Sequence, residues 1–151
     1  MSKIILIGCG KSKVNHREAA RDLYTGSLFV ARRKHAELSG NAWFIISAKY
    51  GLTRPEAMLD PYDLKISQLS ILNRYAWAMH TAAELLDDLP DSIDTAKMLR
   101  EVVVEVHAGA DYAELLRDPI LAAGMSFSWP VKGMIQGEQM QFYASQRLMQ
   151  S

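Results

Sequence analysis

KIILIGCGKSK, at residues 3–13, carries the strongest fold signal in the chain. Its first half, Ile4 to Ile7, is a run of β-branched residues and leucine that Gly8 closes. Such a run is typical of a central strand that is buried on both faces. It is too short to form a signal-peptide core or a membrane span. We therefore expect it to lie in the middle of a parallel sheet.

Patterns further along the chain predict helices and strands in alternation. The expected elements are, in order, a helix over 27–38, a strand over 43–47, a helix over 69–86, a strand over 102–106, a helix that Pro119 breaks, a strand over 126–131 and a helix over 137–149. Residues 53–67 and 91–100 lack a period, so we expect a long ordered loop and a polar connection there. This order predicts an α/β fold, a three-layer α/β/α sandwich with a mainly parallel central sheet of about four strands.

The composition predicts one α/β domain over residues 1–151. Lys plus Arg and Asp plus Glu both number 17, so no overall charge attracts nucleic acid or lipid, and polyanion binding must be local. The single cysteine, Cys9, excludes an internal disulfide and a zinc knuckle and fits a reducing compartment. The sequence thus predicts a cytoplasmic protein with no membrane partner, and it leaves the oligomeric state open.

In open α/β sheets, ligands bind at loops that follow the carboxyl ends of strands. The loop after the first strand offers glycines for close backbone approach and donors for a phosphate. Its candidate binding residues are Gly8, Cys9, Gly10, Lys11, Ser12 and Lys13. A Walker A motif would need glycine at position 5 and a dinucleotide motif would need one at position 13, and neither is present. The loop therefore predicts a local anion site, with a glycine turn bearing solvated lysines as the alternative.

Two further loops are expected at the same edge of the sheet. They contribute polar and aromatic candidates for substrate binding, namely Ser47, Tyr50 and Gly51 after the second strand and His107, Gly109 and Tyr112 after the third. Near the start of the last helix, Gln139 is a candidate for contacting a base edge, with a glutamine-rich solvated face as the alternative.

The segment DPYD at 60–63 places two carboxylates on either side of a rigid turn. Such a pair can orient water or stabilise the cationic sugar that forms when a glycosidic bond breaks. Asp60 and Asp63 are therefore candidate catalytic residues, together with Lys49 from the preceding loop. The alternative is an Asx turn in which Asp63 caps a short helix.

Other reactive residue types give weaker signals. Cys9 is either a nucleophile activated at a strand-to-helix turn or a small buried residue that lines the turn. The four histidines are scattered and no acidic cluster accompanies them, so the sequence predicts neither a metal site nor a cofactor. The basic run at 32–34 is expected on a solvated helix face, with contact to a nucleic-acid backbone as the alternative.

Five ordered motifs carry a resemblance to known proteins: GCGKSK at 8–13, LYTGSLF at 23–29, SAKYGL at 47–52, DPYD at 60–63 and GEQMQF at 137–142. Together they resemble an uncharacterised bacterial and phage family of domains of unknown function, DUF6884. Residues 51–64 are distantly similar to the YaaA peroxide-stress proteins, which are associated with DNA binding, and to domains near archaeosine transglycosylases. The resemblance implies a role around nucleotides or modified nucleic-acid bases, without a defined reaction.

These features predict an enzyme that acts on a nucleotide or a nucleic-acid base at an N-glycosidic bond, with DNA as the first candidate partner. The expected roles are phosphate binding by Lys11, Ser12 and Lys13, stabilisation of the sugar cation or orientation of water by Asp63 or Asp60, base stacking by Tyr62 or Tyr50, and charge neutralisation by Lys49. One alternative is a non-catalytic nucleotide-binding or DNA-binding module that uses the same lysines and aromatic residues. Another is a magnesium-dependent phosphotransfer or phosphohydrolase enzyme.

Overall fold

The computed structural model describes residues 2–150 and has an α/β fold built on a five-stranded sheet of order β4-β3-β1-β6-β7. β1 (Ser2–Gly8) lies in the middle and pairs in parallel with β3 (Ala42–Ser47) and β6 (Val102–His107). β7 (Ser126–Ser128) extends the parallel part, and β4 (Gly51–Thr53) adds an antiparallel edge. The predicted class and the central position of the first strand are confirmed, whereas the sheet has five strands instead of about four.

The strands that the sequence did not reveal are all short. β4 has three residues and follows a turn that requires glycine, since Gly51 has φ of 71°. β2 (Glu18–Ala19) and β5 (Met58–Leu59) form a separate antiparallel pair. Strands of two or three residues cannot show a clear alternation of apolar and polar positions, which is why the sequence predicted irregular structure there.

Six α-helices and one 3₁₀ helix lie in residues 2–150: α1 (Ala20–Leu23), α2 (Ser27–Ser39), η1 (Ile66–Gln68), α3 (Ile71–Asp88), α4 (Ala96–Arg100), α5 (Ala110–Ala122) and α6 (Gln136–Gln150). Two expectations about them are wrong. Pro119 does not break α5, which continues to Ala122 although proline has no N–H to donate to the carbonyl four residues earlier. The connection at 91–100 is not wholly irregular, because Thr95 caps α4 through a bond from Met98 N at 3.0 Å.

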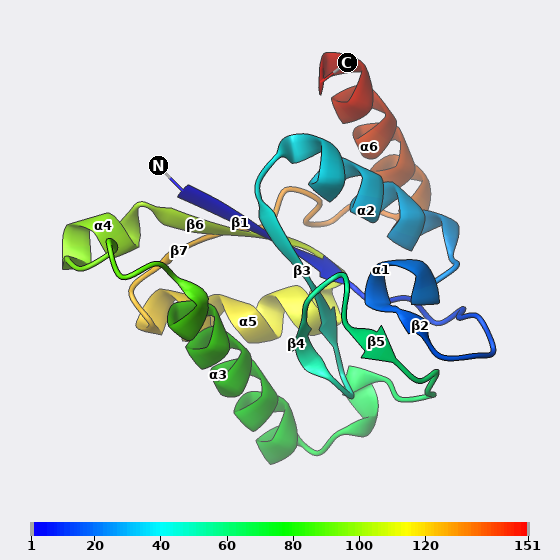
Figure 1. Cartoon of the computed structure of the whole chain (residues 1–151), viewed down its shortest axis with the longest axis horizontal. Helices are drawn as coiled ribbons and strands as arrows, with labels where there is room; N and C mark the ends of the chain where they lie inside the picture. The colour runs from blue at the N-terminus through cyan, green and yellow to red at the C-terminus, as the bar shows by residue number, and fades with distance from the viewer. Residues whose placement is uncertain (1, 151) are drawn as a thin grey trace.

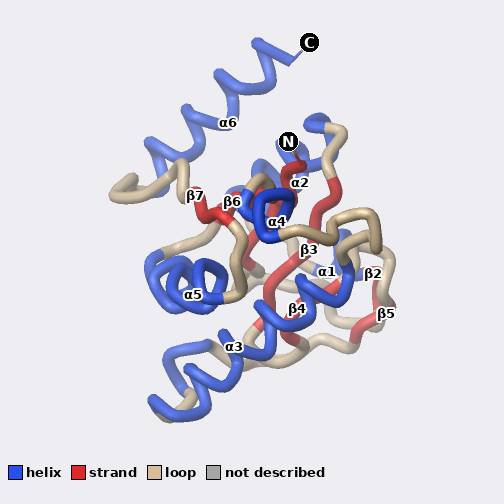
Figure 2. Tube along the Cα trace, turned by 90° about the vertical axis from the view of Figure 1, so that its left-hand side faces the viewer, coloured by secondary structure: helices blue, strands red, loops and turns tan. Residues whose placement is uncertain are grey.

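Helices cover both faces of the sheet, since side chains along a strand alternate between its faces. Ile4 and Leu6 of β1 pack in one cluster with buried residues of α3 and α5. Ile5 and Ile7 pack in another cluster with residues of α1 and α2. Figures 1 and 2 show α3 and α5 on one side of the strands and α2 with α6 on the other. Burying each of these large side chains stabilises the fold by about 1.5–3 kcal/mol.

Within the described residues, no helix combines the length and the apolar character needed to cross a membrane. The longest helix, α3, carries charged residues along its 18-residue length. Four large apolar side chains on it are exposed, namely those of Ile71, Leu72, Tyr75 and Met79.

Candidate ligand pocket at the carboxyl edge of the sheet

The carboxyl ends of β1, β3 and β6 meet along one edge of the sheet. The strand register pairs Gly8 with Ile46 and Ile7 with His107. The loops that leave these three strands therefore begin side by side, as ligand-binding loops do in open α/β sheets.

The loop after β1, residues 9–13, is fixed by backbone contacts to the segment 23–25. Lys13 and Tyr24 form an isolated antiparallel bridge, and Thr25 N donates to Ser12 O at 2.9 Å. β2 and α1 come between this loop and α2. The strand-to-helix turn that the sequence suggested around Cys9 is therefore wrong, and the cationic groups of this loop are lysine side chains and not a helix N-terminus.

The two glycines of this loop have different structural roles. A Cβ added to Gly8 would lie 3.0 Å from Ala108 Cβ and 3.4 Å from Arg32 Nη1. A Cβ added to Gly10 would meet Phe29 Cβ at 3.7 Å, an ordinary van der Waals contact. Gly8 thus permits β1 to pack closely against the chain after β6, and Gly10 is the glycine that lines the pocket.

A second loop reaches the same edge after β4. Backbone bonds from Ala20 N to Ala57 O at 2.8 Å and from Arg21 N to Pro55 O at 2.9 Å attach it to α1, and β5 pairs with β2. This attachment brings residues 63–67 beside the loop after β1. The segment 53–67, expected to be one long loop, thus contains the strand β5 and the beginning of η1.

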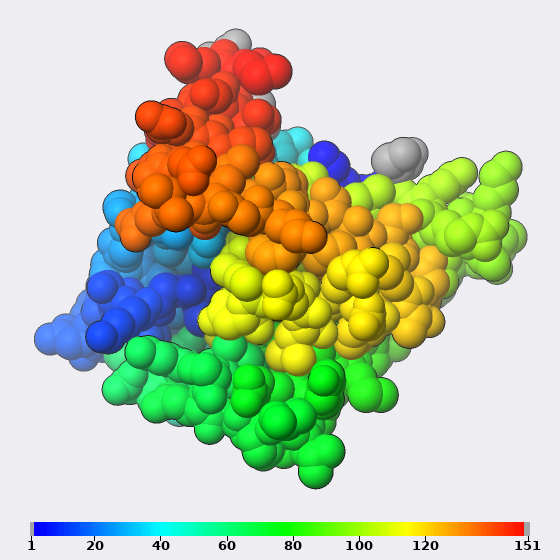
Figure 3. Space-filling view, turned by 180° about the vertical axis from the view of Figure 1, so that it is seen from behind, coloured from blue at the N-terminus to red at the C-terminus, as the bar shows by residue number. Residues whose placement is uncertain are grey.

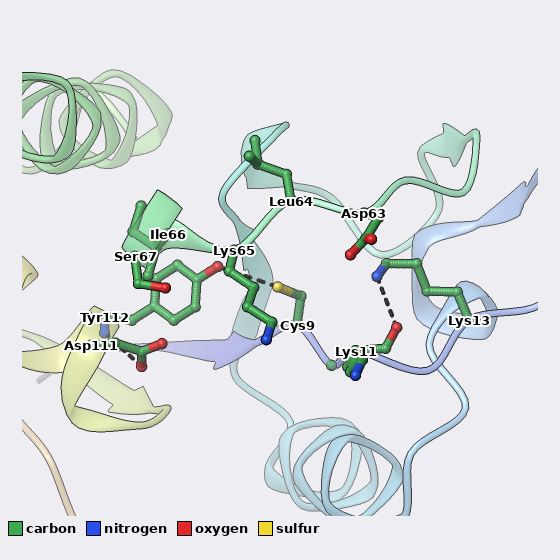
Figure 4. A pocket seen from close by; sticks show the side chains of 11 residues that line it. Cys9, Lys11, Lys13, Asp63, Leu64, Lys65, Ile66, Ser67, Asp111 and Tyr112 are labelled. Carbon is green, nitrogen blue, oxygen red and sulfur yellow. Dashed lines mark hydrogen bonds between the residues drawn. The ribbon is translucent and has the colours of Figure 1, made fainter. Parts of the chain in front are cut away.

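These two loops and the N-terminus of α5 enclose a pocket of about 140 Å³. Figure 4 shows the side chains that line it. The reactive and charged ones are three lysines, two carboxylates, a thiol and a phenol, contributed by Lys11, Lys13, Lys65, Asp63, Asp111, Cys9 and Tyr112. Since a cavity of about 150 Å³ can hold one benzene ring, this pocket has the size of a single sugar ring or base.

Lys13 and Asp63 lie near one another in the pocket (Figure 4). Lys13 Nζ donates to Lys11 O at 3.0 Å. Burial lowers the pKa of Lys13, and the nearby Cys9 and Asp63 offset part of that effect. Within residues 2–150, Asp63 forms no hydrogen bond or ion pair. Its carboxylate is therefore available to a ligand.

At the other side of the pocket, Asp111 and Tyr112 lie in the first turn of α5. Tyr112 Oη lies 3.4 Å from Cys9 Sγ, and Asp111 Oδ1 accepts from Tyr112 N at 3.0 Å. Burial raises the pKa of Tyr112, and the nearby Cys9 raises it further. Tyr112 is therefore a protonated phenol at neutral pH, held against the thiol.

A network of hydroxyl groups lies behind Lys13. Tyr62 Oη is 2.7 Å from both Tyr24 Oη and Ser47 Oγ. Lys13 Nζ lies 4.4 Å from the centre of the Tyr62 ring, within the range of a cation–π contact. Burial raises the pKa of Tyr24 to about 12 and raises that of Tyr62 as well. Tyr62 thus contacts the ammonium group of Lys13 through its ring and does not line the pocket.

Asp60 lies outside the pocket, on the surface. Its carboxylate pairs with Arg17 at 3.1 Å, and both side chains are more than half exposed. Its carbonyl accepts a bond from Tyr50 Oη at 3.0 Å, and Lys49 Nζ lies 5.4 Å from the Tyr50 ring centre. Asp63 is therefore the carboxylate of the DPYD segment that faces the pocket.

The structure brings some of the sequence-predicted site residues together and leaves others apart. The pocket contains Cys9, Gly10, Lys11, Lys13, Asp63 and Tyr112. Outside its lining lie Gly8, Ser12, Ser47, Lys49, Tyr50, Gly51, Asp60, Tyr62, His107, Gly109 and Gln139. Sequence reasoning missed Asp111 and Lys65 as pocket residues. An acidic residue in the first turn of a predicted helix was a usable signal for Asp111, whereas Lys65 has no signal in the sequence.

A second polar cluster lies between the sheet and the helices α2 and α6. His107 Nε2 is 2.7 Å from Glu105 Oε1 and His107 Nδ1 is 2.9 Å from Tyr143 Oη. Lys3 Nζ lies 3.0 Å from Glu105 Oε2, and His35 Nε2 lies 3.8 Å from Glu105 Oε1. Burial lowers the pKa of His107. Burial also acts to raise the pKa of Glu105, but the nearby His107, His35 and Lys3 outweigh it and hold that pKa well below its usual range.

Arg32 and Gln139 belong to the same buried layer. Arg32 Nη2 donates to Gln139 Oε1 at 2.9 Å, and Gln139 Nε2 donates to Met134 O at 3.1 Å. Both residues are buried, with 6% and 7% exposure. The prediction of a solvated face is therefore wrong for Arg32, because α6 packs over that side of α2.

A family of unknown function, DUF6884, matches residues 4–145. The chain belongs to this family. The matched region contains all the residues of the pocket and both histidines of the buried cluster, and it confirms the family that the five motifs predicted. No curated protein and no solved structure matches the chain.

Proposed function

We propose that the protein acts on a nucleotide or a nucleic-acid base and cleaves or exchanges its N-glycosidic bond. The observation that carries this proposal is the convergence of Asp63 with three lysines on one ring-sized pocket. A glycosidic reaction needs a carboxylate beside the sugar carbon that becomes cationic. A nucleotide also brings a phosphate, which cationic side chains bind by charge-assisted hydrogen bonds.

In this proposal the sugar ring occupies the pocket. Asp63, which has no hydrogen-bond or ion-pair partner in residues 2–150, stabilises the oxocarbenium-like centre. Asp111 supplies the second carboxylate, in the role first expected of Asp60, and orients the attacking water or incoming base. The two carboxylates lie on opposite sides of the pocket (Figure 4), so a ring that occupies the pocket would lie between them.

The phosphate binds at the lysine side of the pocket. Lys11 and Lys65 are exposed and Lys13 is half-buried. Lys11 and Lys65 can therefore contact the solvent-facing side of a phosphate, and Lys13 the side that faces the pocket wall. The N-terminus of α5, which begins at Ala110, adds a favourable dipole for an anion. Because the chain has no net charge, these local charges supply the electrostatic part of binding.

The base stays outside the pocket. Sites for whole drug-sized ligands have volumes of about 300–1,000 Å³, and this pocket has about 140 Å³. A base at the mouth of the pocket is compatible with a free nucleotide and with a base carried on single-stranded DNA.

We also propose that the fold is a three-layer α/β/α sandwich. Supporting this, α1 and α2 pack on one face of the sheet and α3 and α5 on the other. In Figure 3, α5 (yellow) lies between α6 (orange to red) and α3 (green) on the outer surface. A site at the carboxyl edge between two helical layers is where such folds bind nucleotides.

The test is the release of free base. Purified protein is incubated with nucleoside 5′-monophosphates and with plain and base-modified DNA, and free base and abasic sites are measured. We expect release from at least one substrate, and a loss of about 100-fold or more in Asp63→Asn. Asp60→Asn is the matched control, because it removes a carboxylate of the same segment from a surface ion pair, and it should keep the activity.

Tight binding without release from any substrate would refute glycosidic chemistry and favour the binding-module alternative. An equal loss of activity in Asp60→Asn and Asp63→Asn would contradict the assignment of Asp63 as the catalytic carboxylate.

A further inference from the structure

A buried group of three side chains, His35, Glu105 and His107, lies apart from the pocket. Their potential ligand atoms all lie within 4.8 Å of one another. Glu105 and His107 are two residues apart on β6 and so project from the same face of the strand. His35 reaches them from α2, on the side of the sheet that also carries α6 (Figure 1).

His35 lacks the short hydrogen bonds that a buried histidine normally forms. The residue is 94% buried, since its exposure is 6%. Its Nδ1 is buried and has no hydrogen-bond partner among residues 2–150. Its Nε2 is 3.8 Å from Glu105 Oε1, beyond hydrogen-bond distance. Nε2, the nitrogen nearest to Glu105, therefore makes no short hydrogen bond with the protein and is the nitrogen that can bind an ion.

We propose that His35, Glu105 and His107 bind a zinc ion. Two imidazoles and one carboxylate are a common ligand set for zinc, which takes four ligands at about 2.0–2.2 Å. Tetrahedral geometry at such bond lengths places ligand atoms about 3.3 Å apart. The spacings to Glu105 Oε1 are 2.7 Å from His107 and 3.8 Å from His35, and all three ligand atoms lie within 4.8 Å of one another. The two histidines must therefore approach each other by up to about 1.5 Å when the ion binds.

The surroundings of the three ligands fit a metal. Tyr143 Oη is 2.9 Å from His107 Nδ1, and it can accept from that nitrogen once His107 Nε2 binds zinc and the ring proton moves to Nδ1. Such an outer hydrogen bond is usual for a metal-binding histidine. Lys3 now pairs with Glu105, but its side chain is 43% exposed, so it can turn into solvent when the ion enters.

The zinc ion would keep an accessible fourth position. A cavity of about 420 Å³ opens at His35 and Glu105, and Lys3, Ser39, Asn41 and Gln146 also line it. Three protein ligands with one open position are the arrangement of catalytic zinc sites, whereas structural sites are closed by four ligands. A water molecule or a small anionic group can therefore be the fourth ligand.

The test is zinc titration of a tag-free chain by calorimetry after treatment with a chelator. We expect one zinc ion per chain, and at least a tenfold weaker Kd in His35→Gln. His35→Gln is the informative variant because it removes one ligand and breaks no short hydrogen bond. His80→Gln is the matched control, since His80 forms a comparable pair with Glu84, at 3.1 Å, on the exposed face of α3.

Zinc-edge anomalous diffraction from zinc-soaked wild-type crystals locates the ion even if His35→Gln fails to fold. A peak between His35, Glu105 and His107 supports the proposal. Absence of stoichiometric zinc binding, a peak elsewhere, or an equal Kd in a folded His35→Gln chain overturns it. These results are independent of base release, because they concern different residues and a different cavity.

Discussion

The pocket and the buried cluster use similar residue types in opposite ways. In the pocket, charged side chains come from loops, and Asp63 has no hydrogen-bond or ion-pair partner in residues 2–150. In the cluster, side chains come from β6, α2 and α6, and Glu105 contacts His107 and Lys3. Because unpaired exposed charges add little to stability and buried pairs are costly to break, the cluster should contribute much more than the pocket to the free energy of unfolding.

The largest expected effect is on stability in the cluster. Glu105→Ala removes the acceptor for His107 and leaves its buried N–H unpaired, so we expect a loss of about 2–3 kcal/mol in the free energy of unfolding. Asp63→Asn should change it by less than about 0.5 kcal/mol. Urea unfolding in the presence of a chelator measures both, with Glu84→Ala as the control for a half-buried carboxylate that pairs with the exposed His80.

Equal losses in Glu105→Ala and Asp63→Asn would remove the distinction between the two regions. A loss of stability in Glu84→Ala as large as that in Glu105→Ala would show that the effect is not specific to the buried cluster.

The two glycines of the first loop are also expected to differ in their contribution to stability. Gly8→Ala places a Cβ 3.0 Å from Ala108 Cβ, so we expect it to lower the free energy of unfolding by about 1–2 kcal/mol. Gly10→Ala meets only ordinary contact and should keep the stability, while it alters ligand affinity at the pocket wall. Thermal unfolding of the two variants side by side tests this, and a more destabilised Gly10→Ala would contradict it.

These positions also show how far the sequence could predict the molecule. The run at 4–7 and the motif GCGKSK indicated the central strand and its loop, because β-strand burial and glycine turns have local signals. Residues 63–67 join the pocket through contacts of the preceding segment, among them the backbone bonds from α1 to Pro55 and Ala57 and the pairing of β5 with β2. Those contacts are not local, so Lys65 carried no signal.

The buried cluster was hidden for a different reason. The sequence predicted that the run at 32–34 would be solvated, because three consecutive basic residues usually are. α6 covers α2 and buries Arg32, and this packing depends on tertiary structure. Glu105 inside the apolar run VVVEVH was the available hint, since a charge in a buried strand needs a partner.

A smaller effect is expected on binding through the pocket lysines. Lys13→Ala removes one cation beside Asp63 and should weaken the affinity for ribose 5-phosphate about tenfold, or about 1.4 kcal/mol. The dependence of affinity on salt should also decrease. Calorimetry at two salt concentrations measures both, with the exposed Lys97→Ala on α4 as the control. The interpretation of the pocket as an anion site would be wrong if Lys13→Ala bound as tightly as Lys97→Ala.

The smallest expected effect comes from Tyr24, behind the pocket. Its pKa is raised to about 12 in the folded state, against about 10 in an unfolded chain. Between these values the unfolded chain loses the proton first, so stability should fall as the pH rises above 10. At pH 11 the share from Tyr24 is about 1 kcal/mol. Urea unfolding at pH 9 and 11 should show a smaller decrease in Tyr24→Phe than in wild type, and equal decreases would contradict this role.

The most direct test of the pocket is a crystal structure with a nucleoside 5′-monophosphate. We predict density for the sugar ring between Asp63 and Asp111, with the phosphate at Lys11, Lys13 and Lys65 and the base at the mouth. Density for the nucleotide elsewhere on the protein, or an empty pocket at a concentration that saturates binding in solution, would contradict the assignment of this pocket as the nucleotide site.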